Sequence, residues 1–600
     1  MLRFLLRNTL VCIGFLSQTA LAGVAVTSWS MTQATPSANV CATPTSNTTF
    51  WTTDPQAALW FAVTGANAGD QATAQWYSPD GDLYTTYHFG KVPTAGNYCF
   101  SGWIGIAGES AASLPGTWTV KLYWNGTLEF TDPFTDTAVS LSFGGSLPPI
   151  ASGGGWDTTV TLLNLSSSSA QASLQFFGDS GSQLSLPFTF PQQPSNLVAV
   201  TPVMDETIAA NALRLVDTSG GTPLAPGVGW GELLSGGNVD GFAIFRYIPT
   251  GQEATVPLET RNAGSYILAF DNTGSLATGV AIANTSSEPA TIPVTISDDT
   301  GTQIGTDSLD LPAQGHTSFM LADNYGFTAG RRGTVLFTTP SGRRISVLGI
   351  RANGAALTTL PALSYADMPS GTLAQVASGG GWQTTFTLVN TGLAPVKAQL
   401  SFFDNNGNPL SLPMVLPQSG KSSTAASLTE TIAAGATLLI VTSGSNGETA
   451  LTGSAVLTAQ GNLDGFAIFR YNPSGQEAVV PLASQSAGSY FLAFDNTDGL
   501  GTGLALANAS SQAAAIPVIL RDDTGASLGT FSINLPAQGH TSFMLTANYP
   551  ATAGKRGTVE LETPTGGSIS AVGLRATPTG VLTTIPVFTG VTAAGGSAER

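Results

Sequence analysis

Apolar and polar residues alternate along most of this chain in short runs. In one run, Thr158, Val160 and Leu162 occupy every second position, and Val280 and Ile282 do the same in another. A period of two is typical of half-buried β-strands, because successive side chains of a strand point to opposite faces. The pattern therefore predicts many short strands, each with one face turned inward.

Turn residues separate these runs. Asp299-Thr300-Gly301, Asn406-Gly407 and Asn125-Gly126 are examples, and they supply the positive φ that tight hairpins need. The best helical candidate, residues 427–434, is short and runs into a glycine. The chain is predicted to be almost entirely β.

The strand pattern of residues 151–365 is repeated at 377–590. Gly241-Phe-Ala-Ile-Phe-Arg-Tyr247 returns at 465–471, an offset of 224 residues (465 less 241), and Leu311 to Leu321 returns at the same offset. Each copy divides again into two related halves of roughly 105–120 residues, the usual size of a two-sheet sandwich. Self-similarity at a fixed period indicates modules in series rather than one large core.

These observations predict seven segments. They are a signal peptide at 1–22, a Trp-rich immunoglobulin-like domain with a disulfide at 23–147, β-sandwich repeats A1 at 148–258, B1 at 259–365, A2 at 366–482 and B2 at 483–590, and a disordered tail at 591–600.

The repeats share one order of strands, and four elements carry the likeness to known modules. They are an Asn-Thr-Ser-Ser element, an Asp-x-x-Gly turn, a Leu-Pro-Ala-Gln-Gly-His-Thr strand and a strand that ends in arginine. In this order the region of about 148–590 resembles the immunoglobulin-like and fibronectin-like sandwich modules of bacterial exported proteins. The resemblance implies tandem all-β sandwiches arranged as beads on a string, and it transfers no functional residue.

The first 22 residues have the layout of a secretory signal. Arg3 and Arg7 precede the apolar run 10–16, which is followed by Ala20-Leu21-Ala22. A transmembrane anchor would need about 20 apolar residues, more than this run contains. A lipoprotein would use Cys12, but Val11 stands where a small residue is expected. We predict cleavage after Ala22, export to the cell surface or the medium, and no transmembrane segment in the mature chain.

Two cysteines, Cys41 and Cys99, remain after this cleavage. An even number in an oxidising compartment predicts one disulfide, and two buried free thiols are the alternative. Two sulfurs without further ligands are too few for a metal site.

The net charge is −17, from 20 basic and 37 acidic residues. There is no basic face to meet phosphates, so nucleic-acid binding is not expected.

Histidine is scarce, with His88, His316 and His540 only, and the last two occupy the same position in B1 and B2. No G-x-S-x-G elbow accompanies them, and a catalytic triad needs a histidine within reach of a nucleophile and a carboxylate. We predict that His316 and His540 bond neighbouring backbone at a hairpin edge, and that the protein is not an enzyme.

Acidic turns recur at Asp298-Asp299, Asp522-Asp523 and Asp404. Calcium prefers such oxygen ligands, but the spacing matches neither an EF-hand nor a nonapeptide calcium repeat. Ordinary turn formers are the favoured interpretation, so no cofactor is predicted, and calcium at the module junctions is the alternative.

One arginine ends the corresponding strand in all four repeats: Arg246, Arg351, Arg470 and Arg575. These residues could form a row of anion-binding guanidinium groups. Their presence in every repeat favours a structural arginine bonded to backbone carbonyls at a module junction.

Seven of the ten tryptophans lie in residues 23–147. Trp60, Trp76 and Trp118 occupy strand-like positions and are predicted to be buried. Three others flank turns or polar residues and are the candidate ligand-binding residues: Trp51, Trp103 and Trp124. Exposed aromatic rings form stacking surfaces for sugars and peptides.

The sequence therefore favours a secreted or cell-surface, non-enzymatic protein with a structural or adhesive role. Its partner would be an extracellular glycan or protein surface. A carbohydrate-binding protein that uses the aromatic residues of its N-terminal domain is the alternative, and an enzyme ranks last.

Overall fold

A computed structural model describes residues 24–32, 41–44, 46–52, 54, 56–106, 109–192, 199–218, 227–365, 370–484 and 487–590. The predicted signal peptide and the tail at 591–600 lie outside these residues. The chain separates into two compact units, Met1–Leu141 with Asp205–Thr207 and Ser142–Met204 with Ile208–Arg600. Within the described residues, no helix is long and apolar enough to cross a membrane.

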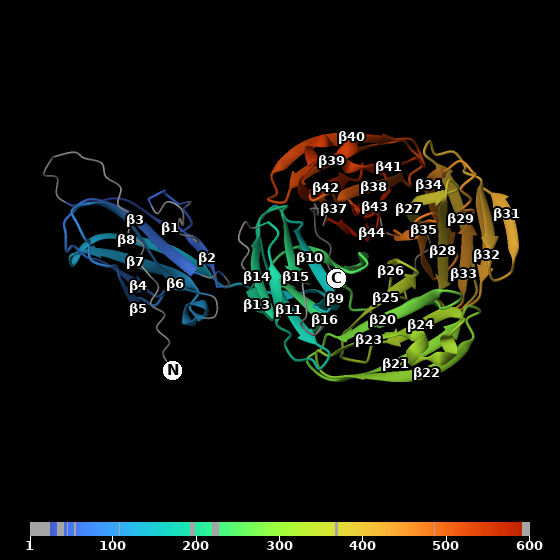
Figure 1. Cartoon of the computed structure of the whole chain (residues 1–600), viewed down its shortest axis with the longest axis horizontal. Helices are drawn as coiled ribbons and strands as arrows, with labels where there is room; N and C mark the ends of the chain where they lie inside the picture. The colour runs from blue at the N-terminus through green and yellow to red at the C-terminus, as the bar shows by residue number, and fades with distance from the viewer. Residues whose placement is uncertain are drawn as a thin grey trace. The chain divides into compact units, whose positions relative to one another are not determined.

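The N-terminal unit is a sandwich of two β-sheets, which Figure 1 shows in blue. One sheet has the order β1 (Ala25–Thr32), β3 (Gln56–Ala66), β6 (Gly96–Gly105). The other has the order β2 (Thr49–Trp51), β8 (Thr127–Thr137), β7 (Gly116–Trp124), β4 (Ala72–Tyr77), β5 (Leu83–His88), and the short 3-10 helix η1 is Ser110–Ser113. Every second residue of β7 from Trp118 onward enters the core, as the period of two predicts.

The predicted disulfide of this unit is confirmed. Cys41 is bonded to Cys99 of β6, and their Cα atoms are 5.2 Å apart. The bond closes a loop with a sequence separation of 58 residues. For a loop of this length, loss of chain entropy in the unfolded state corresponds to about 4 kcal/mol of stabilisation.

The second unit contains four further sandwiches, one for each repeat. In A1, one sheet has the order β14 (Val203–Ile208), β11 (Ala170–Gly178), β16 (Gly227–Ser235), β9 (Ser142–Ser152). The other sheet of A1 has the order β13 (Ala199–Thr201), β12 (Leu186–Thr189), β15 (Leu213–Thr218), β10 (Trp156–Asn164), β17 (Val239–Tyr247), β18 (Gln252–Pro257). In B1 they are β19 (Ser265–Asp271), β24 (Arg332–Thr338), β21 (Ala290–Asp298), β22 (Gln303–Leu311) and β23 (His316–Met320), β20 (Leu276–Asn284), β25 (Ile345–Asn353), β26 (Ala356–Leu360).

The second copy repeats this order. In A2, one sheet has the order β27 (Ser370–Ser378), β34 (Leu451–Ala459), β29 (Val396–Asp404), β32 (Ser427–Ile432). The other sheet of A2 has the order β31 (Lys421–Ala425), β30 (Leu412–Leu416), β33 (Thr437–Thr442), β28 (Trp382–Asn390), β35 (Leu463–Tyr471), β36 (Gln476–Pro481). In B2 they are β40 (Ser527–Leu535), β39 (Ala514–Asp522), β42 (Arg556–Glu562), β37 (Ser489–Asp495), β45 (Val587–Thr589) and β41 (His540–Met544), β38 (Gly501–Asn508), β43 (Ile569–Ala576), β44 (Leu582–Ile585). Single helical turns follow β23 and β41, namely α1 (Leu321–Asn324), η2 (Gly326–Thr328), α2 (Leu545–Asn548) and η3 (Pro550–Thr552).

The fold class of tandem immunoglobulin-like β-sandwiches is confirmed, and almost all regular structure is β, as predicted. The first repeat begins earlier than the predicted residue 148, because β9 starts at Ser142 and pairs with β16 from Ser142↔Ser235 onward. Residues 138–141, which precede β9, carry no composition shift that would mark this boundary in the sequence.

The four repeats are not separate beads, which corrects the predicted arrangement. Backbone hydrogen bonds join A1 to B1 through His316 N and Asp179 O (3.2 Å), and B1 to A2 through Thr437 N and Asp299 O (3.1 Å). The bond from His540 N to Asn405 O joins A2 to B2. A last bond, from Leu213 N to Asp523 O, joins B2 back to A1. The repeats therefore form a closed ring within the second unit (Figure 1).

The ring closes because the repeats are apolar on two faces. In β35 the run 465–469 reads Gly-Phe-Ala-Ile-Phe, so both strand faces are apolar. Ala467 and Phe469 enter the core of A2, whereas Phe466 and Ile468 pack into the core of B1. Strands buried on both faces lose the alternation of polar and apolar positions. That run was the sequence signal for contact between repeats.

The innermost strands of the repeats, β18, β26, β36 and β44, carry a chain of threonine hydroxyl bonds. Thr359 Oγ1 donates to Thr255 O, Thr255 Oγ1 donates to Thr584 O, and Thr584 Oγ1 donates to Val479 O. Each hydroxyl thus reaches the equivalent residue of the preceding repeat. Val479 has no hydroxyl, so the chain has three bonds around four positions. We call these four residues the threonine collar.

Candidate functional site

The tryptophans of the N-terminal unit fall into three environments. Trp60, Trp76 and Trp118 are buried, as predicted. The candidate Trp103 is 39% exposed, and the candidate Trp51 is half-buried. The exposure predicted for Trp124 is wrong, because this residue is only 2% exposed.

Trp124 is buried because it shares the inward face of β7. It lies two residues after Leu122 on the same face, and both belong to the core of the unit. Its Nε1 also donates to Asp70 Oδ2 at 3.3 Å. The adjacent Asn125-Gly126 turn suggested a surface position, but the parity of the strand decides the direction of the side chain.

Trp29 is exposed, although the sequence did not single it out. It is 45% exposed and stacks on Phe130 with ring centroids 4.4 Å apart. The serines on both sides of it were the only sequence signal for a surface position.

The exposed tryptophans do not form one platform. On β3, Trp29 lies opposite Phe61 and Trp103 lies opposite Ala58. These two positions of β3 are an odd number of residues apart, so the two indoles lie on opposite faces of the sheet. Trp103 has Tyr87 as its aromatic neighbour, with ring centroids 6.4 Å apart and an interplanar angle of 39°. Trp103 and Tyr87 are therefore the candidate contact site, which we call the Trp103 site.

The two equivalent histidines lie at repeat junctions. Both are only 2% exposed, and both begin a strand, as predicted. His316 Nδ1 bonds Asp179 Oδ1 of A1 at 2.9 Å. The side-chain partner thus lies in the preceding repeat, which corrects the predicted bond to neighbouring backbone.

His540 makes two such bonds. Its Nδ1 lies 2.8 Å from Asn405 Oδ1, and its Nε2 lies 3.0 Å from Gln375 Oε1. Burial lowers the pKa of His540 to about 4. The A1 residue equivalent to Gln375 is Pro149, so His316 Nε2 has no bonding partner among the described residues.

Two of the four repeated arginines, Arg351 and Arg575, bond carboxylates of another repeat rather than the predicted backbone carbonyls. Arg351 Nε of B1 lies 3.1 Å from Glu477 Oε1 of A2. Arg575 Nε of B2 lies 3.2 Å from Glu253 Oε2 of A1. Arg246 and Arg470 lie opposite Glu253 and Glu477 in their own hairpins.

Both glutamates are only 1% exposed. Glu477 also accepts bonds from Asn353 Nδ2 (3.1 Å) and Thr358 Oγ1 (3.2 Å), and Glu253 accepts one from Thr583 Oγ1 (3.2 Å). A buried carboxylate needs such partners because its desolvation is costly. Neither glutamate was among the predicted site residues, and its repetition at the same position of β18 and β36 was the available sequence signal.

The acidic turns bond their own backbone. Asp298 Oδ1 accepts bonds from the N–H groups of Thr300 and Thr302, each at 3.0 Å, as expected of a turn former. In the part of the chain that the structure describes, no three His, Cys, Asp or Glu side chains are grouped as metal ligands.

The glycine that ends each acidic turn packs against the next repeat. A Cβ atom at Gly181, Gly301, Gly407 or Gly525 would collide with the carbonyl oxygen of Ala313, Ala434, Ala537 or Ala210, respectively. All four glycines have a positive φ, between 79° and 87°. The turns therefore form part of every junction in the ring.

Solved structures match parts of this chain at low identity. No family model matches the chain, and no curated protein matches it in sequence. An immunoglobulin-like protein of Pseudomonas aeruginosa is similar over 20% of this chain and 99% of its own, at 13% identity and a TM-score of 0.15. The CARDB domain of a Pyrococcus furiosus protein, solved with two metal ions, is similar over 15% of this chain and 80% of its own, at 11% identity and a TM-score of 0.12.

A third similar structure is the alkylpurine DNA glycosylase AlkC of Pseudomonas fluorescens bound to DNA. It is similar over 20% of this chain and 31% of its own, at 13% identity and a TM-score of 0.15. At these identities and TM-scores the likenesses transfer no ligand or role to the chain.

Proposed function

We propose that the protein is exported and non-enzymatic, with a structural or adhesive role. In this proposal the ring of four repeats is a stiff body, and the N-terminal unit makes the contact with an extracellular surface. The disulfide Cys41–Cys99 supports an oxidising location. The buried carboxylate junctions support the stiffness of the ring, because every repeat is hydrogen-bonded to two neighbours.

The observation that carries the proposal is the Trp103 site. Trp103 projects from the outer face of β6 with more than a third of its surface exposed, beside Tyr87. Exposed indole rings are over-represented among the residues that dominate binding energy at protein interfaces. The disulfide is attached to the same strand and limits its movement.

The test is retention of the purified chain on immobilised mucin and on immobilised polysaccharides, measured by biolayer interferometry. We expect Trp103→Ala to weaken binding at least tenfold, because a central tryptophan contributes about 2 kcal/mol or more. Trp29→Ala is the matched control, since it removes a similarly exposed indole from the opposite sheet face. Equal losses in both variants would contradict the assignment of the site.

Carbohydrate binding is the second candidate, and the same aromatic pair favours it. A tryptophan face with an adjacent tyrosine suits stacking on a sugar ring. A glycan array should give a signal that Trp103→Ala removes. A blank array for the unaltered chain would eliminate this candidate while leaving adhesion to protein surfaces in place.

Two further measurements address export and the absence of catalysis. Mass spectrometry of the secreted protein should find a mature N-terminus at Gly23. Incubation of the purified chain with chromogenic glycoside, ester and peptide substrates should give no turnover. Turnover in any of these assays would overturn the non-enzymatic proposal.

A further inference from the structure

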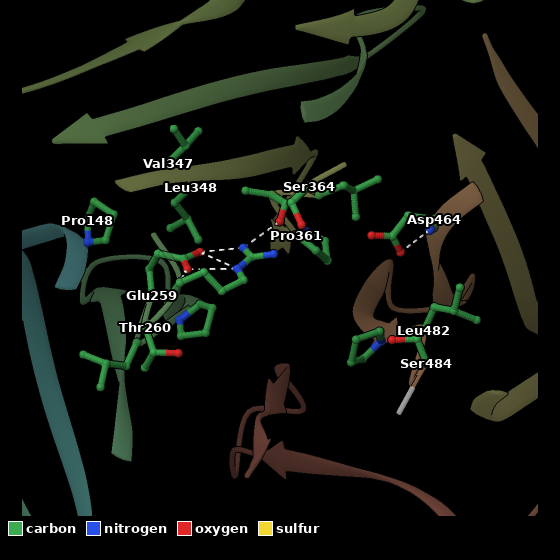
Figure 2. A pocket seen from close by; sticks show the side chains of 17 residues that line it. Pro148, Glu259, Thr260, Val347, Leu348, Pro361, Ser364, Asp464, Leu482 and Ser484 are labelled. Atoms are coloured by element: carbon green, nitrogen blue, oxygen red, sulfur yellow. Dashed lines mark hydrogen bonds and ion pairs between the residues drawn. The ribbon is translucent and has the colours of Figure 1, made fainter. Parts of the chain in front are cut away.

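A cavity of about 440 Å³ lies where the inner strands of A1, B1 and A2 end. The proline steps that follow these strands line it, namely Pro257, Pro361 and Pro481. Leu258, Leu348 and Leu482 add further apolar surface. Figure 2 shows that charged side chains lie among these apolar groups.

Two of the charged side chains neutralise each other. Arg261 Nε lies 2.9 Å from Glu259 Oε1, and Arg261 Nη2 lies 2.5 Å from Glu259 Oε2. Arg261 Nη2 also donates to Ala362 O at 2.9 Å. Both oxygens of the Glu259 carboxylate thus accept hydrogen bonds, and they engage the Nε and Nη2 donors of Arg261.

Asp464 is the remaining charge. It is 7% exposed, and its Oδ1 accepts a bond of 2.7 Å from the N–H of Gly465. Its Oδ2 makes no hydrogen bond or ion pair within the described residues, and in Figure 2 it points toward the middle of the cavity. Burial raises the pKa of Asp464 to about 6, so the group is ionised at neutral pH. A buried carboxylate oxygen without a partner is costly unless a ligand supplies one.

The other half of the duplicated chain has a different set of residues at these positions. Asp240 is equivalent to Asp464 and likewise accepts a bond from the next N–H, of Gly241, at 2.8 Å. At the offset of 224 residues, Glu259 corresponds to Ala483, and Arg261 corresponds to Gln485, which lies outside the described residues. The ion pair beside the aspartate is thus particular to the B1–A2 side.

We propose that this cavity binds a primary ammonium group carried on an aliphatic chain. The ammonium would donate to Asp464 Oδ2, and the aliphatic chain would lie against the leucines and prolines. The side-chain charges of the cavity sum to −1, from Glu259, Arg261 and Asp464, which matches a monocation. A calcium ion would require six to eight oxygen ligands, and one free carboxylate does not supply them.

A primary ammonium of this kind occurs on free alkylamines and on lysine side chains of a partner protein. Isothermal titration of the full chain at pH 7.5 separates these sources, with n-pentylamine and Nα-acetyl-lysine N-methylamide as probes. We expect at least one probe to bind. Binding of the lysine derivative alone would identify a protein side chain as the occupant, and binding of both would identify the group itself.

Asp464→Asn should reduce the affinity for the bound probe at least tenfold. The matched control is Asp240→Asn, which alters the equivalent residue outside the cavity and should leave the affinity unchanged. Glu259→Gln is a second variant, because it frees Arg261 to compete for Asp464 and should also weaken binding. Thermal unfolding of each variant establishes that it is folded.

The unaltered chain provides two further readouts. n-Pentanol, which has the same aliphatic chain without the charge, should not bind, and amine affinity should fall about tenfold from pH 7 to pH 5 as Asp464 takes up a proton. Absence of binding by both amines at 10 mM (roughly 3 kcal/mol of affinity or less) would overturn the proposal. Equal binding of n-pentanol, or equal affinity in Asp464→Asn, would overturn it as well.

Discussion

At the scale of single residues, equivalent histidines of the repeats make different numbers of side-chain hydrogen bonds. His540 has partners on both ring nitrogens, whereas His316 has one on Nδ1 only among the described residues. The difference follows from one substitution between the copies, Gln375 in A2 against Pro149 in A1. Duplicated modules can thus diverge in their junction chemistry while the strand pattern stays the same.

The buried His540 predicts a dependence of stability on pH. Its folded-state pKa of about 4 lies below the unfolded value near 6.5, so the unfolded chain binds the proton more tightly. The stability that His540 contributes is therefore complete above pH 6.5 and is lost as the pH falls toward 4. The total effect is up to about 3 kcal/mol.

Urea unfolding of the full chain at pH 7 and pH 5 measures this effect. His540→Gln should show a smaller loss of unfolding free energy between the two pH values than the unaltered chain. The exposed His88→Gln is the control and should behave like the unaltered chain. The same loss in all three proteins would contradict the role of His540.

At the scale of elements, the turns and inner strands of the sandwiches do two tasks each. The acidic turns reverse the chain and also form the contact with the next repeat through their glycines. The inner strands close their own sheets and also carry the threonine collar. A turn motif or a strand motif in the sequence therefore predicts the local structure of the element but not its contact with the next repeat.

Gly301→Ala should destabilise the B1–A2 junction. Its positive φ costs an alanine about 1 kcal/mol, and the collision of the new Cβ with Ala434 O raises the total to roughly 3 kcal/mol. Gly274 also has a positive φ but has open space around it, so Gly274→Ala should cost only about 1 kcal/mol. Chemical unfolding of both variants provides the comparison, and equal costs would exclude a contribution from the junction.

Val479→Thr should complete the threonine collar. The new hydroxyl would occupy the position that Thr255 has in A1 and would donate to the carbonyl of Thr359, with a gain of about 1 kcal/mol in unfolding free energy. The reverse change, Thr255→Val, should lose a similar amount because it removes an existing bond. Differential scanning calorimetry should give midpoint shifts of opposite sign, and a decrease in both would contradict the collar.

At the scale of the whole second unit, closure replaces the end repeats that a linear array requires. Linear repeat proteins need terminal repeats with polar outer faces. Here A1 contacts B2 through Glu253 and Arg575, so the first and last repeats cover each other. Each repeat therefore depends on two neighbours, and loss of one junction affects the ring as a whole.

Glu477→Ala tests this dependence. The change removes the buried carboxylate that pairs with the half-buried Arg351 and should lower the unfolding free energy by about 3–5 kcal/mol. Glu448→Ala, at an exposed glutamate that bonds Ser443, should cost less than about 1 kcal/mol. Equilibrium unfolding in urea measures both, and a small cost for Glu477→Ala would indicate that the junction does not stabilise the ring.

Local sequence information was sufficient for the strands, the turns, the repetition of related sandwiches inside the second unit and the disulfide pair. These features depend on residues close together in the chain or, for Cys41 and Cys99, on there being one pairing to make. The alternation of inward and outward residues along β7 is also present in the sequence. It places Trp124 on the same inward face as Trp118.

Which residues pair across the repeat junctions was decided by the tertiary structure alone. His540 and Gln375 are 165 residues apart, and Glu253 and Arg575 are 322 apart, so no local pattern relates them. A period of two predicts that one face of a strand is buried. Which repeat packs on that face depends on how the chain closes into the ring. The amino-acid sequence thus determined five sandwiches, and long-range burial of their second apolar faces determined that four of them form a ring with a charged cavity.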